Sequence, residues 1–121
     1  MWACKMSEDQ TYKRACQIIE LALTKKAQEL VLMNLKGLSA ITDYFIICHG
    51  DSDLHVKAIA DAVLNGMKRE KIYVWHIEGY EYLNWVLLDY IDIVVHIFQK
   101  KTREFYNLER LWGDAEIKEF H

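Results

Sequence analysis

Two carboxylates, Asp89 and Asp92, have the spacing that most invites a chemical role, because they lie close together in the otherwise apolar segment 85–98, WVLLDYIDIVVHIF. Paired carboxylates bind Mg²⁺ or the basic groups of a partner. Side chains alternate along a strand, so a β-hairpin turning near Tyr90 and Ile91 brings Asp89 and Asp92 opposite each other. Like charges in that arrangement destabilise a strand pair. The two carboxylates therefore either accept backbone N–H bonds of the turn or meet basic groups of a partner.

The predicted hairpin has two unlike faces. The expected register pairs Leu88 with Ile93, Leu87 with Val94, and Val86 with Val95. One face is wholly apolar and should pack against helices; it carries Val86, Leu88, Ile93, Val95 and Ile97. The other face mixes aromatic, aliphatic and acidic groups; it carries Trp85, Leu87, Asp89, Asp92, Val94, His96 and Phe98. Large apolar anchors beside charges are typical of a protein-recognition surface, and Trp85 is its strongest candidate anchor.

A turn formed by Gly50, Asp51 and Ser52 is the second candidate site, since it lies between a predicted strand and a helix N-terminus. Backbone N–H groups in that setting bind anions, and nucleotidyltransferases use a Gly-Ser pair there for phosphate. Asp51 would repel phosphate, however, and no Asp-x-Asp or Asp-x-Glu lies on the strand that should carry the Mg²⁺ ligands. We therefore favour a helix cap, and the histidine spacing predicts neither a metal site nor a cofactor.

Composition limits the class of protein. The chain has 121 residues, of which 52% are hydrophobic and 27% charged, as expected for one globular domain. No apolar run is long enough to span a membrane and no signal peptide is visible, so the expected location is the cytoplasm. A net charge of −3 argues against autonomous nucleic-acid binding and favours a basic protein partner. The three cysteines lack CxxC spacing and are expected to be reduced.

The expected elements follow the order α-β-β-α-β-β-β-α. A capping box of Ser7 and Gln10 should open the first helix. Strands at 28–34 and 43–49 come before a helix that begins at Ser52, and a strand at 72–76 comes before the hairpin. A last helix, capped by Thr102, should bury a stripe of Phe105, Leu108, Leu111 and Trp112 and end at Gly113. These elements predict an α/β fold, a mixed sheet of about five strands with helices packed on it.

Several segments together resemble one known family. They are 43–60 (DYFIICHGDSDLHVKAIA), 76–79 (HIEG), 85–98 (WVLLDYIDIVVHIF) and 103–112 (REFYNLERLW). In this order they closely resemble the Iojap family, also called ribosomal silencing factors. The resemblance covers roughly residues 8–112 of the single domain 1–121, and it leaves 113–121 as a C-terminal tail.

The resemblance implies a nucleotidyltransferase-like fold without catalytic acids, and hence a protein that is not an enzyme. It implies binding to the large ribosomal subunit through large-subunit ribosomal protein fourteen on the intersubunit face. The bound factor would block joining of the small subunit and repress translation when nutrients are short. The family's contact motif falls on Trp85, Leu87, Leu88 and Asp89, with Tyr90 and Asp92 nearby.

Two alternatives remain open. The chain could be a nucleotidyltransferase-like enzyme or a nucleotide-binding protein that uses the turn at 50–52. The hairpin face could also form a homodimer.

The chain departs from the family pattern at Ile91, where Gly is usual, and at His49 and Asp51, where Thr and Asn are usual. If residue 91 needs a positive φ, the β-branched side chain is strained there.

Overall fold

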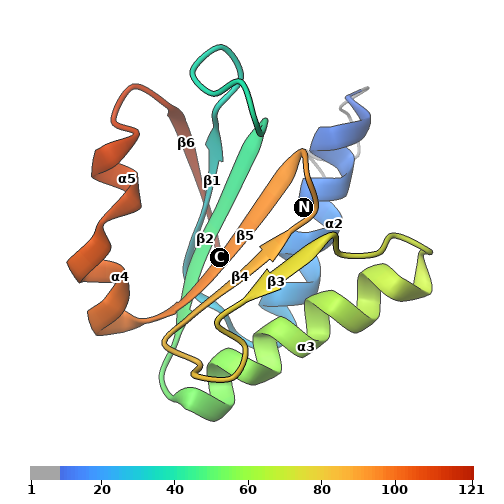
Figure 1. Ribbon diagram of the computed structural model, residues 1–121, viewed down its shortest axis with the longest axis vertical. Helices are drawn as coiled ribbons and strands as arrows, with labels where there is room; N and C mark the ends of the chain where they lie inside the picture. Colours follow the sequence, from blue (N-terminus) through green and yellow to red (C-terminus); the bar gives the residue numbers. More distant parts are fainter. Residues whose placement is uncertain (1–8) are drawn as a thin grey trace.

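A mixed six-stranded sheet forms the centre of the fold, in the strand order β3-β4-β5-β2-β1-β6 (Figure 1). The computed structural model describes residues 9–121. Its strands are β1 (Gln28–Asn34), β2 (Tyr44–Gly50), β3 (His76–Glu78), β4 (Trp85–Asp89), β5 (Ile93–Gln99) and β6 (Glu116–Phe120). Only β2 and β5 pair in parallel; the other neighbours are antiparallel. The predicted α/β class is confirmed, but the sheet has six strands because the expected tail supplies β6, which pairs with β1.

Helices α2 (Gln10–Leu23) and α3 (Asp53–Arg69) cover one face of the sheet (Figure 1). Asp9 begins α2 by accepting hydrogen bonds from the N–H groups of Thr11 and Tyr12. The predicted Ser7 cap lies outside the described residues. Ser52 caps α3, as expected, by accepting from the N–H of His55 at 3.2 Å.

The two helices pack closely because of a glycine. A Cβ at Gly66 of α3 would overlap the side chain of Leu21 in α2. The main apolar core lies beneath them and contains the predicted apolar face of the hairpin, whose five side chains are all buried: Val86, Leu88, Ile93, Val95 and Ile97. Cys48 is a free thiol in this core, as expected, whereas Cys16 is disulfide-bonded, so the expectation of reduced cysteines is wrong there.

The hairpin of β4 and β5 has the predicted faces but not the predicted register. The observed pairs are Trp85 with Phe98, Val86 with Ile97, Leu87 with His96, Leu88 with Val95, and Asp89 with Val94. The expected register was therefore wrong by two residues along β5. Because side chains repeat every two residues, a shift of two leaves each side chain on its face. Asp89 lies opposite Val94, so the expected pairing of Asp89 with Asp92 does not occur.

The last predicted helix is broken in two. Helices α4 (Lys100–Tyr106) and α5 (Leu108–Leu111) meet at Asn107, whose φ of 45° is left-handed. The expected buried stripe is wrong: Leu108 is buried, but Phe105 is 81% and Leu111 75% exposed. The break changes the helical phase between Phe105 and Leu108, and α5 ends at Leu111. Gln99 takes the N-cap position expected for Thr102. The short strand before the hairpin is also displaced, to 76–78 from 72–76.

Candidate partner-binding face

The second face of the sheet is covered only in part. Helices α4 and α5 lie on the side opposite α2 and α3 and pack over a small second apolar cluster that includes Phe98 and Leu108 (Figure 1). Beyond them, half-buried side chains of neighbouring strands share the uncovered area. We call this area the open face; it comprises Phe45 of β2, Val94 of β5, and Trp85, Leu87 and Asp89 of β4.

Trp85 is held in place on the open face by aromatic contacts. Its ring stacks on Phe98 with centroids 4.9 Å apart and lies 4.7 Å from the ring of Tyr106. Its indole N–H donates to Nδ1 of His96 at 3.0 Å. Trp85 is therefore half-buried and less exposed than the sequence indicated, and it offers only part of its ring to a partner.

His96 lies beneath Trp85 and is neutral. Because Nδ1 accepts from the indole, the imidazole proton belongs on Nε2. That atom is buried and has no hydrogen-bond partner within residues 9–121. Burial lowers the pKa of His96 to about 3. His96 thus orients Trp85 and contributes no charge to the face on which the sequence placed it.

Asp89 caps the hairpin turn. Its Oδ1 accepts from the N–H of Ile91 at 2.7 Å, which confirms the capping interpretation for this residue. Ile91 has a φ of 76°, so the departure from the family's usual glycine places a β-branched residue in a left-handed conformation. The side chain of Asp92 is exposed, while its backbone carbonyl accepts from the N–H groups of Asp43 and Tyr44.

The six predicted contact residues do not all share one face. Trp85, Leu87 and Asp89 lie together on the open face, and Asp92 lies exposed at its end. Leu88 is fully buried on the other side of the sheet. Tyr90 packs against the main core, and burial raises its pKa to about 12. Leu88 and Tyr90 can therefore support the hairpin but do not face a partner on the open side.

Sequence reasoning missed the residues that complete this area. Phe45 joins it through the parallel pairing of β2 with β5, which places Phe45 beside Val94. Tyr106 and Trp112 border it from the α4–α5 segment; the ring of Trp112 lies 6.1 Å from that of Phe45. The aromatic content of the segment 103–112 was a usable signal, but it was interpreted as core.

The turn at 50–52 has little capacity left for an anion. The N–H of Asp51 donates to Nδ1 of His55 at 2.8 Å, and Oδ1 of Asp51 accepts from Gln28 at 2.7 Å. Ser52 is occupied as the cap of α3. Within the described part of the chain, no three His, Cys, Asp or Glu side chains are grouped so that they could hold a metal ion.

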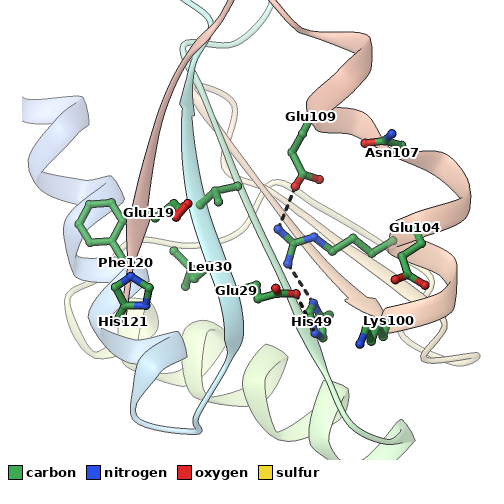
Figure 2. Close-up of a pocket in the computed structure, with 12 residues that line it drawn as sticks. Glu29, Leu30, His49, Lys100, Glu104, Asn107, Glu109, Glu119, Phe120 and His121 are labelled. Atoms are coloured by element: carbon green, nitrogen blue, oxygen red, sulfur yellow. Dashed lines mark hydrogen bonds and ion pairs between the residues drawn. The ribbon is translucent and has the colours of Figure 1, made fainter.

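A hollow of about 660 Å³ lies between the α4–α5 segment and strands β1 and β6 (Figure 2). Arg103 is one of its lining residues and is itself only 7% exposed. Its guanidinium donates to Nδ1 of His49 at 2.9 Å and to the carboxylate of Glu109 at 3.1 Å. These contacts join β2, α4 and α5.

None of the described helices is long and apolar enough to cross a membrane.

Comparison with known proteins gives consistent matches over most of the chain. The family model for "ribosomal silencing factor during starvation" matches residues 8–121. The ribosomal silencing factor RsfS of Halalkalibacterium halodurans is 46% identical over 103 residues, which cover 82% of this chain and 88% of that protein. The RsfS of Bacillus subtilis is 44% identical over 93 residues, covering 77% and 79% respectively.

A more distant relative comes from mouse and is named mitochondrial assembly of ribosomal large subunit protein 1. It is 30% identical over 99 residues, which cover 78% of this chain and 43% of that protein. Two solved structures are similar in fold. A Chromobacterium violaceum protein superposes with a TM-score of 0.84 at 30% identity, covering 87% of this chain and 88% of that one. A Bacillus halodurans protein gives 0.76 at 41% identity, covering 83% and 93%.

Proposed function

Because the chain belongs to the family of ribosomal silencing factors, we propose that it binds the large ribosomal subunit and blocks joining of the small subunit, which represses translation. The family resemblance expected from the sequence is confirmed. The observation that carries the proposal is the open face, where aromatic and aliphatic groups lie beside carboxylates on one incompletely covered side of the sheet.

The proposed partner is large-subunit ribosomal protein fourteen on the intersubunit face. Leu87 and the accessible part of Trp85 would fill an apolar depression on that protein, as buried anchors do at interface centres. Asp92, which is exposed, and Asp89 would face its lysine or arginine side chains, mainly steering the encounter and fixing the register. Repression then follows from steric occlusion in the cytoplasm, without catalysis or a cofactor.

The enzyme alternative depends on the turn at 50–52. Its N–H and side-chain groups are engaged with His55 and Gln28, which disfavours a phosphate there. Thermal unfolding with ATP or CTP and Mg²⁺ tests it. A ligand at 100 times its Kd stabilises a folded protein by about 2.7 kcal/mol. We expect no such shift, and a clear one would restore the enzyme hypothesis.

A second copy of the chain is the competing occupant of the open face. A homodimer through this face would have to dissociate before ribosome binding. Labelled protein is titrated with large subunits at two protein concentrations, one above and one below that at which any dimer forms. If both associations use the same face, they are mutually exclusive, and dimer formation should weaken the apparent binding to large subunits.

Subunit reassociation on a sucrose gradient tests the proposal directly. Large and small subunits are mixed in Mg²⁺ with wild-type protein or with Leu87→Arg, which places a charge on the open face. We expect wild type to comigrate with large subunits and to reduce the joined ribosome peak, and the variant to do neither. A wild-type protein that stays off large subunits at moderate salt would refute the proposal.

A further inference from the structure

The α4–α5 segment borders the open face, and few of its side chains are buried. Among the side chains of the two helices, Arg103 and Leu108 are the buried ones. The segment nevertheless brings Tyr106 against Trp85, with ring centroids 4.7 Å apart. The position of Tyr106, and with it the support of Trp85, therefore depends on what holds these two short helices in place.

Arg103 makes most of the side-chain hydrogen bonds that attach the α4–α5 segment to the sheet and its two helices to each other. Its Nη1 donates to Nδ1 of His49 at 2.9 Å and to the carbonyl oxygen of Gln28 at 3.4 Å, while Nη2 donates to Glu109 at 3.1 Å. In Figure 2 one dashed line reaches His49, below, and another reaches Glu109, above. Arginine remains charged and can only donate, so Nδ1 of His49 must be the acceptor. The bond between them exists only while His49 is neutral.

We propose that Arg103 is a positioning residue of the partner-binding face: its bonds to His49 and Glu109 fix the α4–α5 segment against the sheet, and partner binding weakens when His49 gains a proton. The inference rests on the proposed function, which supplies the binding event. Neither Arg103 nor His49 belongs to the open face, so their effect on binding passes through Tyr106 and Trp112, the residues of the segment that border it.

The groups around His49 decide whether its proton disrupts the network. Glu29 of β1 lies 3.7 Å from Nε2 and would attract a charged imidazole, while Asp51, after β2, also favours the charge. Arg103 and Lys100 of α4 oppose it. The Glu29 side chain is 75% exposed, so water weakens its attraction, whereas Arg103 is buried and in direct contact with the ring. Desolvation and Arg103 therefore prevail, and the pKa of His49 is lowered.

A matched set of variants tests the proposal. His49→Asn puts an amide oxygen near the place of Nδ1 and does not titrate; Arg103→Gln removes the charge and the forked donor. His55→Asn is the control, because His55 also accepts an N–H through Nδ1 but lies at the start of α3. Affinity for isolated large subunits is measured at pH 7.5 and 5.5. We expect wild type and His55→Asn to lose roughly two- to fivefold in acid, because the pKa of His49 is lowered and part of the rings stays neutral at pH 5.5. His49→Asn should keep its affinity.

Amide hydrogen exchange of residues 100–112 in the free protein gives a second readout that needs no ribosomes. We expect faster exchange there in Arg103→Gln at pH 7.5, and in wild type but not His49→Asn at pH 5.5, after correction for the intrinsic rate. An acid loss of binding in His49→Asn equal to that of wild type would overturn the inference, as would unchanged exchange in Arg103→Gln. If wild type fails to bind large subunits at all, the proposed function fails, while the exchange experiment still decides whether Arg103 holds the segment.

Discussion

Leu87 is the residue whose substitution should weaken partner binding with the least effect on the stability of the fold. It lies in the middle of β4 on the open face and belongs to neither apolar cluster of the described chain. Trp85 does not offer that separation, because its ring stacks on Phe98 and Tyr106 and its indole N–H bonds to His96. Truncating Trp85 would remove packing as well as a partner contact.

We therefore predict that Leu87→Ala weakens binding to large subunits by about tenfold or more, while the melting temperature stays within about 2 °C of wild type. Cosedimentation and calorimetry give the two quantities. Leu54→Ala is the matched control, since Leu54 is 77% exposed on α3, which covers the other face of the sheet. A large fall in melting temperature for Leu87→Ala would mean that Leu87 is a core residue.

Ile91 carries backbone strain that a glycine would relieve. Its φ of 76° costs a β-branched residue about 1–2 kcal/mol, and its side chain is 56% exposed, so little burial is lost on removal. We predict that Ile91→Gly raises the free energy of unfolding by about 1 kcal/mol, and the melting temperature by about 4 °C. Urea unfolding checks this, and a lower stability would show that the Ile91 side chain makes contacts that outweigh the strain.

At the scale of elements, the hairpin shows what the sequence can predict. Alternation from Trp85 to Phe98 assigned every side chain to its correct face, because the apolar residues recur with a period of two. The register was wrong by two, since a shift of that size preserves the faces and only the loop conformation distinguishes the two registers. That conformation depends on the left-handed Ile91, which propensity disfavours.

The C-terminal elements could not be predicted for related reasons. A single left-handed residue, Asn107, divides the last helix, so Phe105 no longer shares a helical face with the buried Leu108. Strand β6 is an edge strand whose side chains are almost all exposed, so it has no apolar pattern to reveal it. On the open face, Trp85, Leu87 and Asp89 followed from alternation, whereas Phe45 and Tyr106 join through long-range pairing and the helix break.

The loop before β4 depends on a glycine that presses against the site. Gly79 has a φ of 77°, and a Cβ there would overlap the carbonyl oxygen of Trp85. We predict that Gly79→Ala lowers the free energy of unfolding by about 2 kcal/mol or more and also weakens partner binding by displacing Trp85. Thermal unfolding and cosedimentation measure the two effects.

Gly37→Ala provides the matched control for this steric effect. Gly37 has a similar φ of 83°, but a Cβ there meets nothing within 4 Å. The substitution should therefore cost only the backbone term of about 1 kcal/mol and leave binding unchanged. If both substitutions lowered the free energy of unfolding equally, the close approach of Gly79 to Trp85 would not contribute to the effect of Gly79→Ala.

The whole molecule is asymmetric in how its sheet is covered. Helices α2 and α3 bury one face, while α4 and α5 cover only part of the other (Figure 1). Beneath the less covered side lie two buried histidines, His49 and His96, each involved in a hydrogen bond that requires an unprotonated Nδ1. The same side of the fold thus contains the proposed binding face and the groups most sensitive to acid.

These histidines make stability fall in mild acid. Burial lowers the pKa of His96 to about 3, and burial with Arg103 lowers that of His49, whereas both are near 6.5 in the unfolded chain. Above pH 6.5 both states are neutral and stability is unaffected. Below it the unfolded chain binds protons more readily than the folded chain, so stability falls. The slope is up to about 1.4 kcal/mol per pH unit for His96, and His49 adds to it in the same direction.

We predict that the free energy of unfolding drops by up to about 2 kcal/mol through His96 between pH 6.5 and 5, a range above the usual carboxylate pKa values, with a further fall through His49. Urea titrations at half-unit steps measure the slope. His96→Asn keeps an acceptor for Trp85 without a titrating ring, so it should reduce the slope, and adding His49→Asn should reduce it further. A wild-type stability that is flat over this range would mean that both rings accept protons in the folded state.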